Sequence, residues 1–273
     1  MRQILWIPFD YDRVKYTPKP EWVLSRHALF HEFTMRSLLN QTRDDFTIAL
    51  LCGQRHRALT ESLAWHRRVR LVYDEGRALL SEIVAIGNDF AGFTRLDSDD
   101  LMASDAIEWI DGLCEKMKDP AKVAAFVCNR NLYWDRVNRC IGRHHRLNQP
   151  PPFVTRIYPQ SVLADYDAWR AKMFLGHGMQ TKRALNPTPI GENVYCIVKH
   201  GTNTSRVRRD EDHPTCPLQR LVALKKSNKL ISIDPVEIAE MLKPYGISRE
   251  LAMQAPSVKF HGGEFIESEK GER

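Results

Sequence analysis

The sequence predicts an α/β fold in which a mostly parallel, twisted sheet is flanked by helices. Short apolar runs alternate with amphipathic segments over the first hundred residues, so strands and helices are expected to follow one another in turn. The chain has 273 residues and 43% of them are hydrophobic, which is enough for one large domain with a sizeable core. The glycine motifs of NAD-type and P-loop phosphate sites do not occur in the sequence, so neither type of site is expected.

Four buried strands are expected within the first hundred residues. Each is a short run of apolar and β-branched residues that ends at a proline, a glycine or acidic residues. They occupy residues 4–9, 46–53, 69–73 and the segment that runs from residue 90 into an acidic turn. Helices are expected between them, at 27–42, 54–68 and 77–89, because apolar residues there recur three and four positions apart. This alternation favours a parallel sheet that is covered on both faces.

The rest of the chain is expected to follow a less regular pattern. Helices are predicted at 104–117, 164–174, 234–244 and 246–254, and strands at 123–128, 153–159 and 194–200. Residues 129–150 are expected to be irregular, because arginine and histidine are frequent there and a stiff connection of Pro150, Pro151 and Pro152 closes the segment.

Charge and cysteine content narrow the class of protein. The formal net charge of +6 fits an anionic ligand, a phosphate-bearing acceptor or a membrane surface, and does not by itself imply nucleic-acid binding. The six cysteines are scattered without a CxxC pair, as expected of reduced thiols in a reducing compartment. No apolar run approaches the roughly 20 residues of a membrane span, and residues 1–9 do not resemble a signal peptide. We therefore expect a cytoplasmic protein, with peripheral contact at the inner face of the membrane left open.

The acidic turn holds three carboxylates within four positions. In an extended segment Asp97 and Asp99 point to one side and Asp100 points to the other. Carboxylates this close repel one another, and a divalent cation would remove the cost of burying them. Oxygen ligands suit Mg²⁺ or Mn²⁺, so the turn predicts a metal–diphosphate site at the end of a strand. The alternative is a solvated turn in which Asp100 or Ser104 caps the next helix.

Three stretches carry a resemblance to a known family. Residues 37–42 read SLLNQT, residues 45–47 read DFT and open the second strand, and residues 94–100 read TRLDSDD. Together they resemble the GT-A fold glycosyltransferases, and most closely a bacterial family described as putative rhamnosyltransferases. The resemblance is good over residues 1–130 and weaker around 195–206.

The resemblance implies an architecture and a set of ligands. It implies a GT-A-like fold with a nucleotide-sugar-binding half at 1–130 and an irregular acceptor-side half of the same domain at 131–260. The tail at 261–273 is expected to be mobile because it is polar and contains glycine. The donor would be a UDP-, GDP- or dTDP-sugar, the acceptor a glycan or a lipid-linked glycan, and the cofactor Mn²⁺ or Mg²⁺.

The resemblance also assigns roles to particular residues. Asp97 and Asp99 match the DxD positions that bind metal, ribose and diphosphate, and His200 is placed like a late histidine that completes the metal shell. We expect the strand before His200 to be central in the same parallel sheet, so that His200 emerges at the edge where the acidic turn lies; the alternative is a structural histidine. The candidates are, for catalysis, Asp99, Asp100, Glu192 and Asp212; for donor binding, Pro8, Asp10, Arg95, Asp97 and Arg206; and for metal, Asp97, Asp99 and His200. Asp210 and Glu211 compete with Glu192 and Asp212 for the role of catalytic base, and Arg208 and Arg209 accompany Arg206.

Three other functions stay open on the sequence alone. A nucleotidyltransferase also pairs carboxylates with a metal, but it usually carries a glycine-rich phosphate loop, and residues 8–20 contain no glycine. The positive charge and the arginines between 130 and 146 suit a nucleic-acid-associated module. A glycosyltransferase that modifies a hydroxylated nucleobase in DNA, as some phage enzymes do, would combine both properties.

Overall fold

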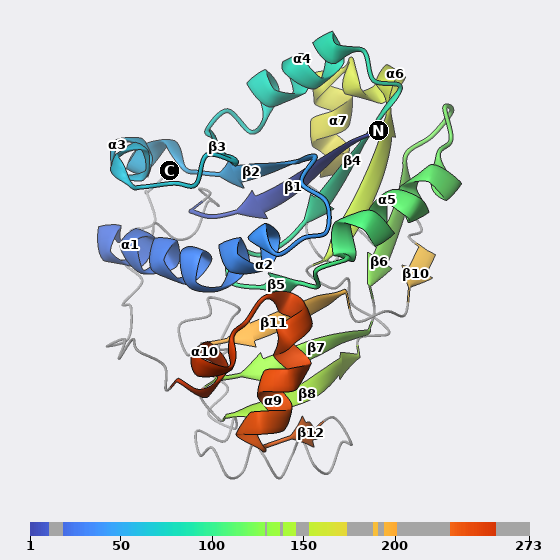
Figure 1. Cartoon of the computed structure of the whole chain (residues 1–273). Coiled ribbons are helices and arrows are strands. Elements are labelled where there is room, and N and C mark those ends of the chain that lie inside the picture. The colour runs from blue at the N-terminus through green and yellow to red at the C-terminus, as the bar shows by residue number, and fades with distance from the viewer. Residues whose placement is uncertain are drawn as a thin grey trace, which may run out of the picture.

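The computed structural model describes residues 1–10, 19–128, 130–136, 139–145, 153–173, 188–190, 194–200 and 230–254 (Figure 1). Within these residues the chain forms two sheets, one of seven strands and one of five. The expected tail at 261–273 and the prolines at 150–152 lie outside the described residues.

The larger sheet is mostly parallel, as predicted. Its order is β10-β6-β9-β4-β1-β2-β3. The strands of the first hundred residues, β1 to β4, are parallel to one another, and β9 is antiparallel to its neighbours β4 and β6. The bounds are Arg2–Pro8 for β1, Phe46–Leu51 for β2, Val69–Val72 for β3, Phe90–Arg95 for β4, Ala124–Cys128 for β6, Val154–Pro159 for β9 and Thr188–Ile190 for β10. The α/β fold class expected from the sequence is therefore confirmed.

Helices cover both faces of this sheet (Figure 1). One face carries a long helical segment made of α1 (Pro20–Leu29), a π-helical turn η1 (Phe30–Met35) and α2 (Arg36–Leu39), together with α5 (Ala106–Met117). The opposite face carries α4 (Arg77–Ile86), α6 (Gln160–Leu163) and α7 (Tyr166–Met173). The alternation of side chains along β1 explains the two layers, because Leu5 and Ile7 enter the first cluster and Ile4 and Trp6 the second. Both faces of the sheet are buried, so its strands are apolar on both sides.

The smaller sheet has the order β12-β8-β7-β11-β5. Its strands are β5 (Leu101–Met102), β7 (Arg130–Asp135), β8 (Cys140–His145), β11 (Tyr195–Lys199) and β12 (Leu230–Ser232). The short helices α9 (Pro235–Leu242), η4 (Lys243–Tyr245) and α10 (Arg249–Met253) pack beside it (Figure 1). Because β5 comes six residues after β4, the acidic turn is the link between the two sheets.

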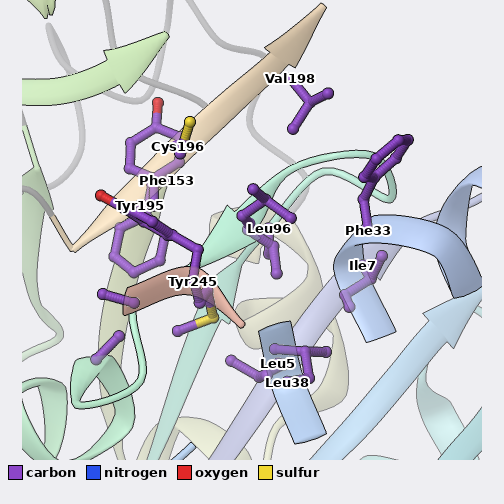
Figure 2. Packing of buried hydrophobic residues seen from close by; sticks show 14 of the residues in the cluster. Leu5, Ile7, Phe33, Leu38, Leu96, Phe153, Tyr195, Cys196, Val198 and Tyr245 are labelled. Carbon is purple, nitrogen blue, oxygen red and sulfur yellow. The ribbon is translucent and has the colours of Figure 1, made fainter. Parts of the chain in front are cut away.

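One apolar cluster joins the two sheets. Figure 2 shows Leu5 of β1 and Leu96 after β4 facing residues of β11 and the end of η4. Phe153 and Tyr195 stack within this cluster, with ring centroids 5.1 Å apart and planes at 15°. The halves of the chain are also interleaved, since β9 lies between β4 and β6 and β5 pairs with β11. The division near residue 130 into donor-side and acceptor-side parts stays a prediction.

A second apolar cluster lies on the opposite face of the larger sheet, and its aromatic rings contact Gly76. Trp6, Phe93 and Trp169 form a cluster of edge and tilted ring contacts there, with centroids 5.5 to 6.1 Å apart. Gly76 precedes α4 with φ of +88°, and a Cβ at this position would lie 2.6 Å from Cη2 of Trp6. Both the backbone conformation and the close approach of the ring require glycine.

Several sequence expectations need correction. Residues 129–150 are not simply irregular, because β7 and β8 form an antiparallel pair there. Leu132 and Trp134 of β7 are buried, and the charged residues that masked this alternation, Arg130, Asp135 and Arg136, stand on either side of them in the sequence. The first helix begins at Pro20 instead of residue 27, and proline is favoured at a first helical position. The helix expected at 54–68 is shorter: a 3-10 turn, η2 (Gln54–His56), leads into α3 (Arg57–Ser62).

Candidate functional site

The acidic turn follows β4 at the carboxyl end of the larger sheet. The last sheet-like contact is made by Leu96, whose amide donates to the carbonyl of Trp6 over 3.2 Å. The chain then turns, with the amide of Asp100 donating to the carbonyl of Asp97 over 3.1 Å. Carboxyl ends of parallel strands are where open α/β sheets bind ligands, so the turn stands at the expected edge.

Asp99 lies at the centre of a buried charge cluster. Arg26 of α1 donates to both of its carboxylate oxygens, from Nη1 to Oδ2 over 2.8 Å and from Nη2 to Oδ1 over 3.0 Å. Its Nε donates to the hydroxyl of Ser98 over 2.8 Å. Burial by itself would raise the pKa of Asp99, but the charge of Arg26 and the contact with His200 outweigh it and lower the pKa to about 2. Asp99 is therefore ionised, and Arg26, which binds both of its oxygens in a bidentate fork, is its main counter-ion.

His200 lies against the same carboxylate. Its Nε2 is 2.9 Å from Oδ2 of Asp99, and both side chains are buried. The expected proximity to the acidic turn is thus observed, but the expected route to it is wrong. β11 belongs to the smaller sheet, where it is parallel to β7 and antiparallel to β5. The histidine reaches Asp99 because β5 begins one residue after the turn and pairs with β11.

Asp100 and Asp97 face different surroundings. Oδ1 of Asp100 accepts a hydrogen bond of 3.0 Å from the amide of Val198, two residues before His200. Burial raises the pKa of Asp100 well above its ordinary value, and the neighbouring charges of Asp99 and Asp97 raise it further. Asp97 accepts from Nη2 of Arg95 over 3.0 Å and keeps about a third of its side chain exposed. Asp100 therefore links β11 to the turn by a hydrogen bond, whereas the side chain of Asp97 is accessible to a ligand.

Asp10 and Pro8 stand at the end of β1, as expected, but the carboxylate of Asp10 points inward. Its Oδ1 accepts from the amide of Gly53 over 2.6 Å, and its Oδ2 lies 3.2 Å from Nδ1 of His56. Pro8 pairs with Leu51 in the register of β1 and β2. Asp10 thus ties the end of β1 to the segment that follows β2, and its donor-binding role stays a prediction.

Several predicted site residues lie outside the described residues. They are Glu192, Arg206, Arg208, Arg209, Asp210, Glu211 and Asp212. The structure therefore brings together Asp97, Asp99, Asp100, Arg95 and His200, and the identity of a catalytic base stays a prediction.

Two buried arginines beside this cluster were not predicted as site residues from the sequence. Arg26 is one of them. Arg136 donates from Nη1 to Glu32 over 3.2 Å, and its guanidinium lies 4.7 Å from the ring centroid of Phe33. The amide of Arg136 also donates to the carbonyl of Lys199, the residue before His200. The signal for Arg26 was its place in the apolar stripe of a helix, with buried residues three, four and seven positions later, since a charge there needs a buried partner.

The oxygen and nitrogen atoms at Asp99 and His200 are of the kinds that bind a divalent cation, but Arg26 already occupies Asp99. Two ligands at right angles around an ion at 2.0–2.1 Å lie about 2.9 Å apart, which is the separation of Asp99 Oδ2 and His200 Nε2. Carboxylate oxygens with one imidazole also suit Mn²⁺. However, the guanidinium of Arg26 now takes the neighbouring positions on Asp99, and the described residues contain no ready group of three His, Cys, Asp or Glu side chains that could hold an ion. As it stands, the cluster offers an ion two adjacent ligand atoms, Oδ2 of Asp99 and Nε2 of His200.

Known proteins are similar to this chain in sequence pattern and in shape. A family model described as "Putative rhamnosyl transferase" matches residues 11–206. A search of the curated proteins finds no match. Within the described residues, every helix is too short or too polar to cross a membrane.

Three solved structures are distant neighbours. TarS of S. aureus is 13% identical with a TM-score of 0.36, and the similarity covers 92% of this chain and 44% of TarS, so the chain spans less than half the length of that protein. Rv0371C of Mycobacterium tuberculosis, solved in complex with manganese, is 14% identical with a TM-score of 0.33 over 74% of this chain and 94% of its own. A protein of Desulfovibrio desulfuricans described as a putative nucleotide-diphospho-sugar transferase is 11% identical with a TM-score of 0.30, covering 83% and 98%.

Proposed function

The chain belongs to the family described as "Putative rhamnosyl transferase", and on this basis we propose that it is a glycosyltransferase that moves a hexose or deoxyhexose from a nucleotide sugar to a hydroxyl acceptor. The observation that carries the proposal is the buried cluster of Asp99, His200 and Arg26 at the carboxyl end of β4. A cluster of opposite charges at that edge suits a ligand that combines a diphosphate with a cation.

The donor diphosphate is proposed to bind over the acidic turn. Asp97, Asp99 and His200 are the residues that would hold Mn²⁺ or Mg²⁺, and such an ion would stabilise the negative charge of the departing diphosphate as a Lewis acid. Asp97 is accessible for contact with the ribose or the ion, and Arg95 orients it. The backbone amide of Arg136 bonds to the residue before His200, and its buried guanidinium, paired with Glu32, adds positive charge on the side of the smaller sheet.

Asp100 is proposed to support this arrangement from behind. It accepts from the backbone of β11 and so places His200 against Asp99. Its raised pKa favours the protonated form, which reduces the repulsion among the three carboxyl groups. Glu192 and Asp212 stay the proposed candidates for the base that takes the acceptor proton.

The donor is proposed to be a UDP-, GDP- or dTDP-sugar and the acceptor a glycan or a lipid-linked glycan. The test is a screen of these nucleotide sugars, with dTDP-rhamnose among them, on the full chain with Mn²⁺ present. Release of the nucleoside diphosphate is measured with and without a panel of glycan acceptors. We expect turnover with one nucleotide class and a loss of orders of magnitude in Asp99→Asn, since the charge is removed while the shape is kept. Normal activity in this variant would reduce the acidic turn to a structural role.

The same preparation tests the DNA alternative. Binding of unmodified and hydroxymethylated duplexes is measured between 50 and 200 mM salt, because contacts to phosphates give a steep salt dependence. Sub-micromolar binding at the higher salt would overturn the choice of a glycan acceptor while leaving the sugar-transfer reaction in place.

A further inference from the structure

The fork that Arg26 makes on Asp99 occupies the carboxylate that the proposed function requires for a cation. We propose that Arg26 is an internal counter-cation: it holds Asp99 in the unliganded protein and, when a divalent cation and a nucleoside diphosphate bind together, exchanges Asp99 for the diphosphate. This inference rests on the proposed function and adds to it a residue that couples the two ligands.

The geometry explains why the two cations compete. Arg26 contacts both oxygens of Asp99, at 2.8 and 3.0 Å, and His200 lies 2.9 Å from one of them. A carboxylate offers about four lone-pair positions, so at least three of them are already used. A metal ion that shares Asp99 with His200 would stand beside the guanidinium in a buried site, where like charges repel strongly. Arg26 must therefore release Asp99 before that carboxylate can coordinate an ion.

The release of Asp99 needs a second ligand because the buried charge of Arg26 must remain paired. Arg26 is almost fully buried, and a buried guanidinium without a counter-ion is strongly unfavourable. A cation alone would leave Arg26 in that state. A nucleoside diphosphate offers phosphate oxygens, for which the planar guanidinium is well suited. The exchange keeps every charge paired, so each ligand should favour the binding of the other.

Two further contacts hold the guanidinium of Arg26 at the acidic turn. Its Nε donates to Ser98 in the acidic turn, and its guanidinium lies 5.6 Å from the ring centroid of Trp22, one turn earlier on α1. These contacts keep the charged group beside the turn after the fork on Asp99 opens.

Calorimetry of Mn²⁺ binding to the metal-free full chain tests the proposal. Titrations are made alone and in the presence of UDP, GDP or dTDP in turn, and the nucleotide titrations are repeated with Mn²⁺ present. For the wild type we expect weak binding of Mn²⁺ alone and an increase in affinity of about tenfold or more with one nucleotide, which is within the usual range of coupling between sites. The coupling must be reciprocal, so Mn²⁺ should raise the affinity for that nucleotide by the same factor.

The decisive variant is Arg26→Gln, with Arg68→Gln as the matched control. Arg68 forms an exposed ion pair with Asp44 over 3.1 Å and takes no part in the cluster. We expect Arg26→Gln to bind Mn²⁺ alone about tenfold or more tightly than the wild type and to lose most of the coupling, and Arg68→Gln to match the wild type. A merely structural role for Arg26 would lower Mn²⁺ affinity in the variant, so a gain distinguishes the two.

The possible failures are distinguishable. Wild-type Mn²⁺ affinity and coupling in Arg26→Gln would overturn the role of Arg26, while turnover of a nucleotide sugar by the wild type would leave the proposed function standing. If no Mn²⁺ binds to the wild type with any nucleotide, both the metal site and the role of Arg26 are wrong. Should Arg26→Gln fail to fold by circular dichroism, Arg26→Lys keeps the charge but cannot form the fork, and an Mn²⁺ affinity equal to the wild type in that variant would also overturn the proposal.

Discussion

Removal of the Asp99 charge should destabilise the unliganded protein, and the structure sets the size of the effect. The pKa of Asp99 is about 2 against an ordinary 3.8, and each pKa unit corresponds to about 1.4 kcal/mol. The ionised form is therefore favoured by about 2 kcal/mol in the fold after the cost of burial. Asp99→Asn also leaves Arg26 buried without its counter-ion, and breaking a buried pair from one side typically costs about 3–5 kcal/mol. We expect a loss of about 2–5 kcal/mol in the free energy of unfolding at pH 7.

Urea denaturation in the presence of a chelator measures this loss. Because the pKa of Asp99 is depressed, its contribution is complete above pH 3.8 and disappears as the pH falls towards 2, so pH 7 is suitable. A cycle of Asp99→Asn, Arg26→Met and the double variant isolates the pair, and the double variant should be less destabilised than the sum. Asp44→Asn is the control, since that side chain is 79% exposed in its pair with Arg68 and should change stability by at most about 1 kcal/mol. A loss below about 0.5 kcal/mol in Asp99→Asn, or zero coupling, would refute the argument.

Three further outcomes are expected. A chelator should abolish donor turnover and added Mn²⁺ should restore it; full turnover in EDTA would show that the reaction needs no divalent ion. Gly76→Ala should lower the free energy of unfolding by about 1–3 kcal/mol through its positive φ and the contact with Trp6, whereas Gly87→Ala, with φ of +74° and open space around its Cβ, should cost only the backbone part of about 1 kcal/mol; equal losses in urea denaturation would mean that the contact is harmless. Burial lowers the pKa of His31 and nearby His27 lowers it further, so the free energy of unfolding should fall as the pH drops below 6.5, and His31→Phe should flatten the profile between pH 7 and 5; an unchanged slope would exclude His31 as its source.

The elements that sequence analysis predicted well are those whose signal is local. The strands β1 to β4 are nearly continuous apolar runs because both faces of the larger sheet are covered, and their positions were found within one or two residues. The hairpin of β7 and β8 was missed because its charged residues conceal the alternation of Leu132 and Trp134, and because its stability comes from pairing with β11, more than fifty residues later. Local propensity carries no information about such a partner.

The candidate site was predictable only in part for the same reason. The acidic turn is a local motif, and the proximity of His200 was expected, although through the wrong sheet. Arg26 escaped detection because its partner lies 73 positions further along the chain and because the helix was expected to begin one residue after it. A guanidinium inside an apolar stripe is the pattern that would have revealed it.

The contact between Asp100 and β11 has a consequence for how relatives of this chain should be compared. Asp100 binds the amide of Val198, not its side chain, so this hydrogen bond excludes only proline at position 198, while burial of the side chain in the apolar cluster requires an apolar residue there. Exchanges among apolar residues at 198 then need no compensation at 100, and the two columns of a family alignment should vary independently. Methods that infer spatial proximity from co-variation would therefore overlook the join that brings His200 to the acidic turn. A chimaera that exchanges the smaller sheet between relatives should retain Asp100 of the acidic turn, whichever apolar residue stands at position 198.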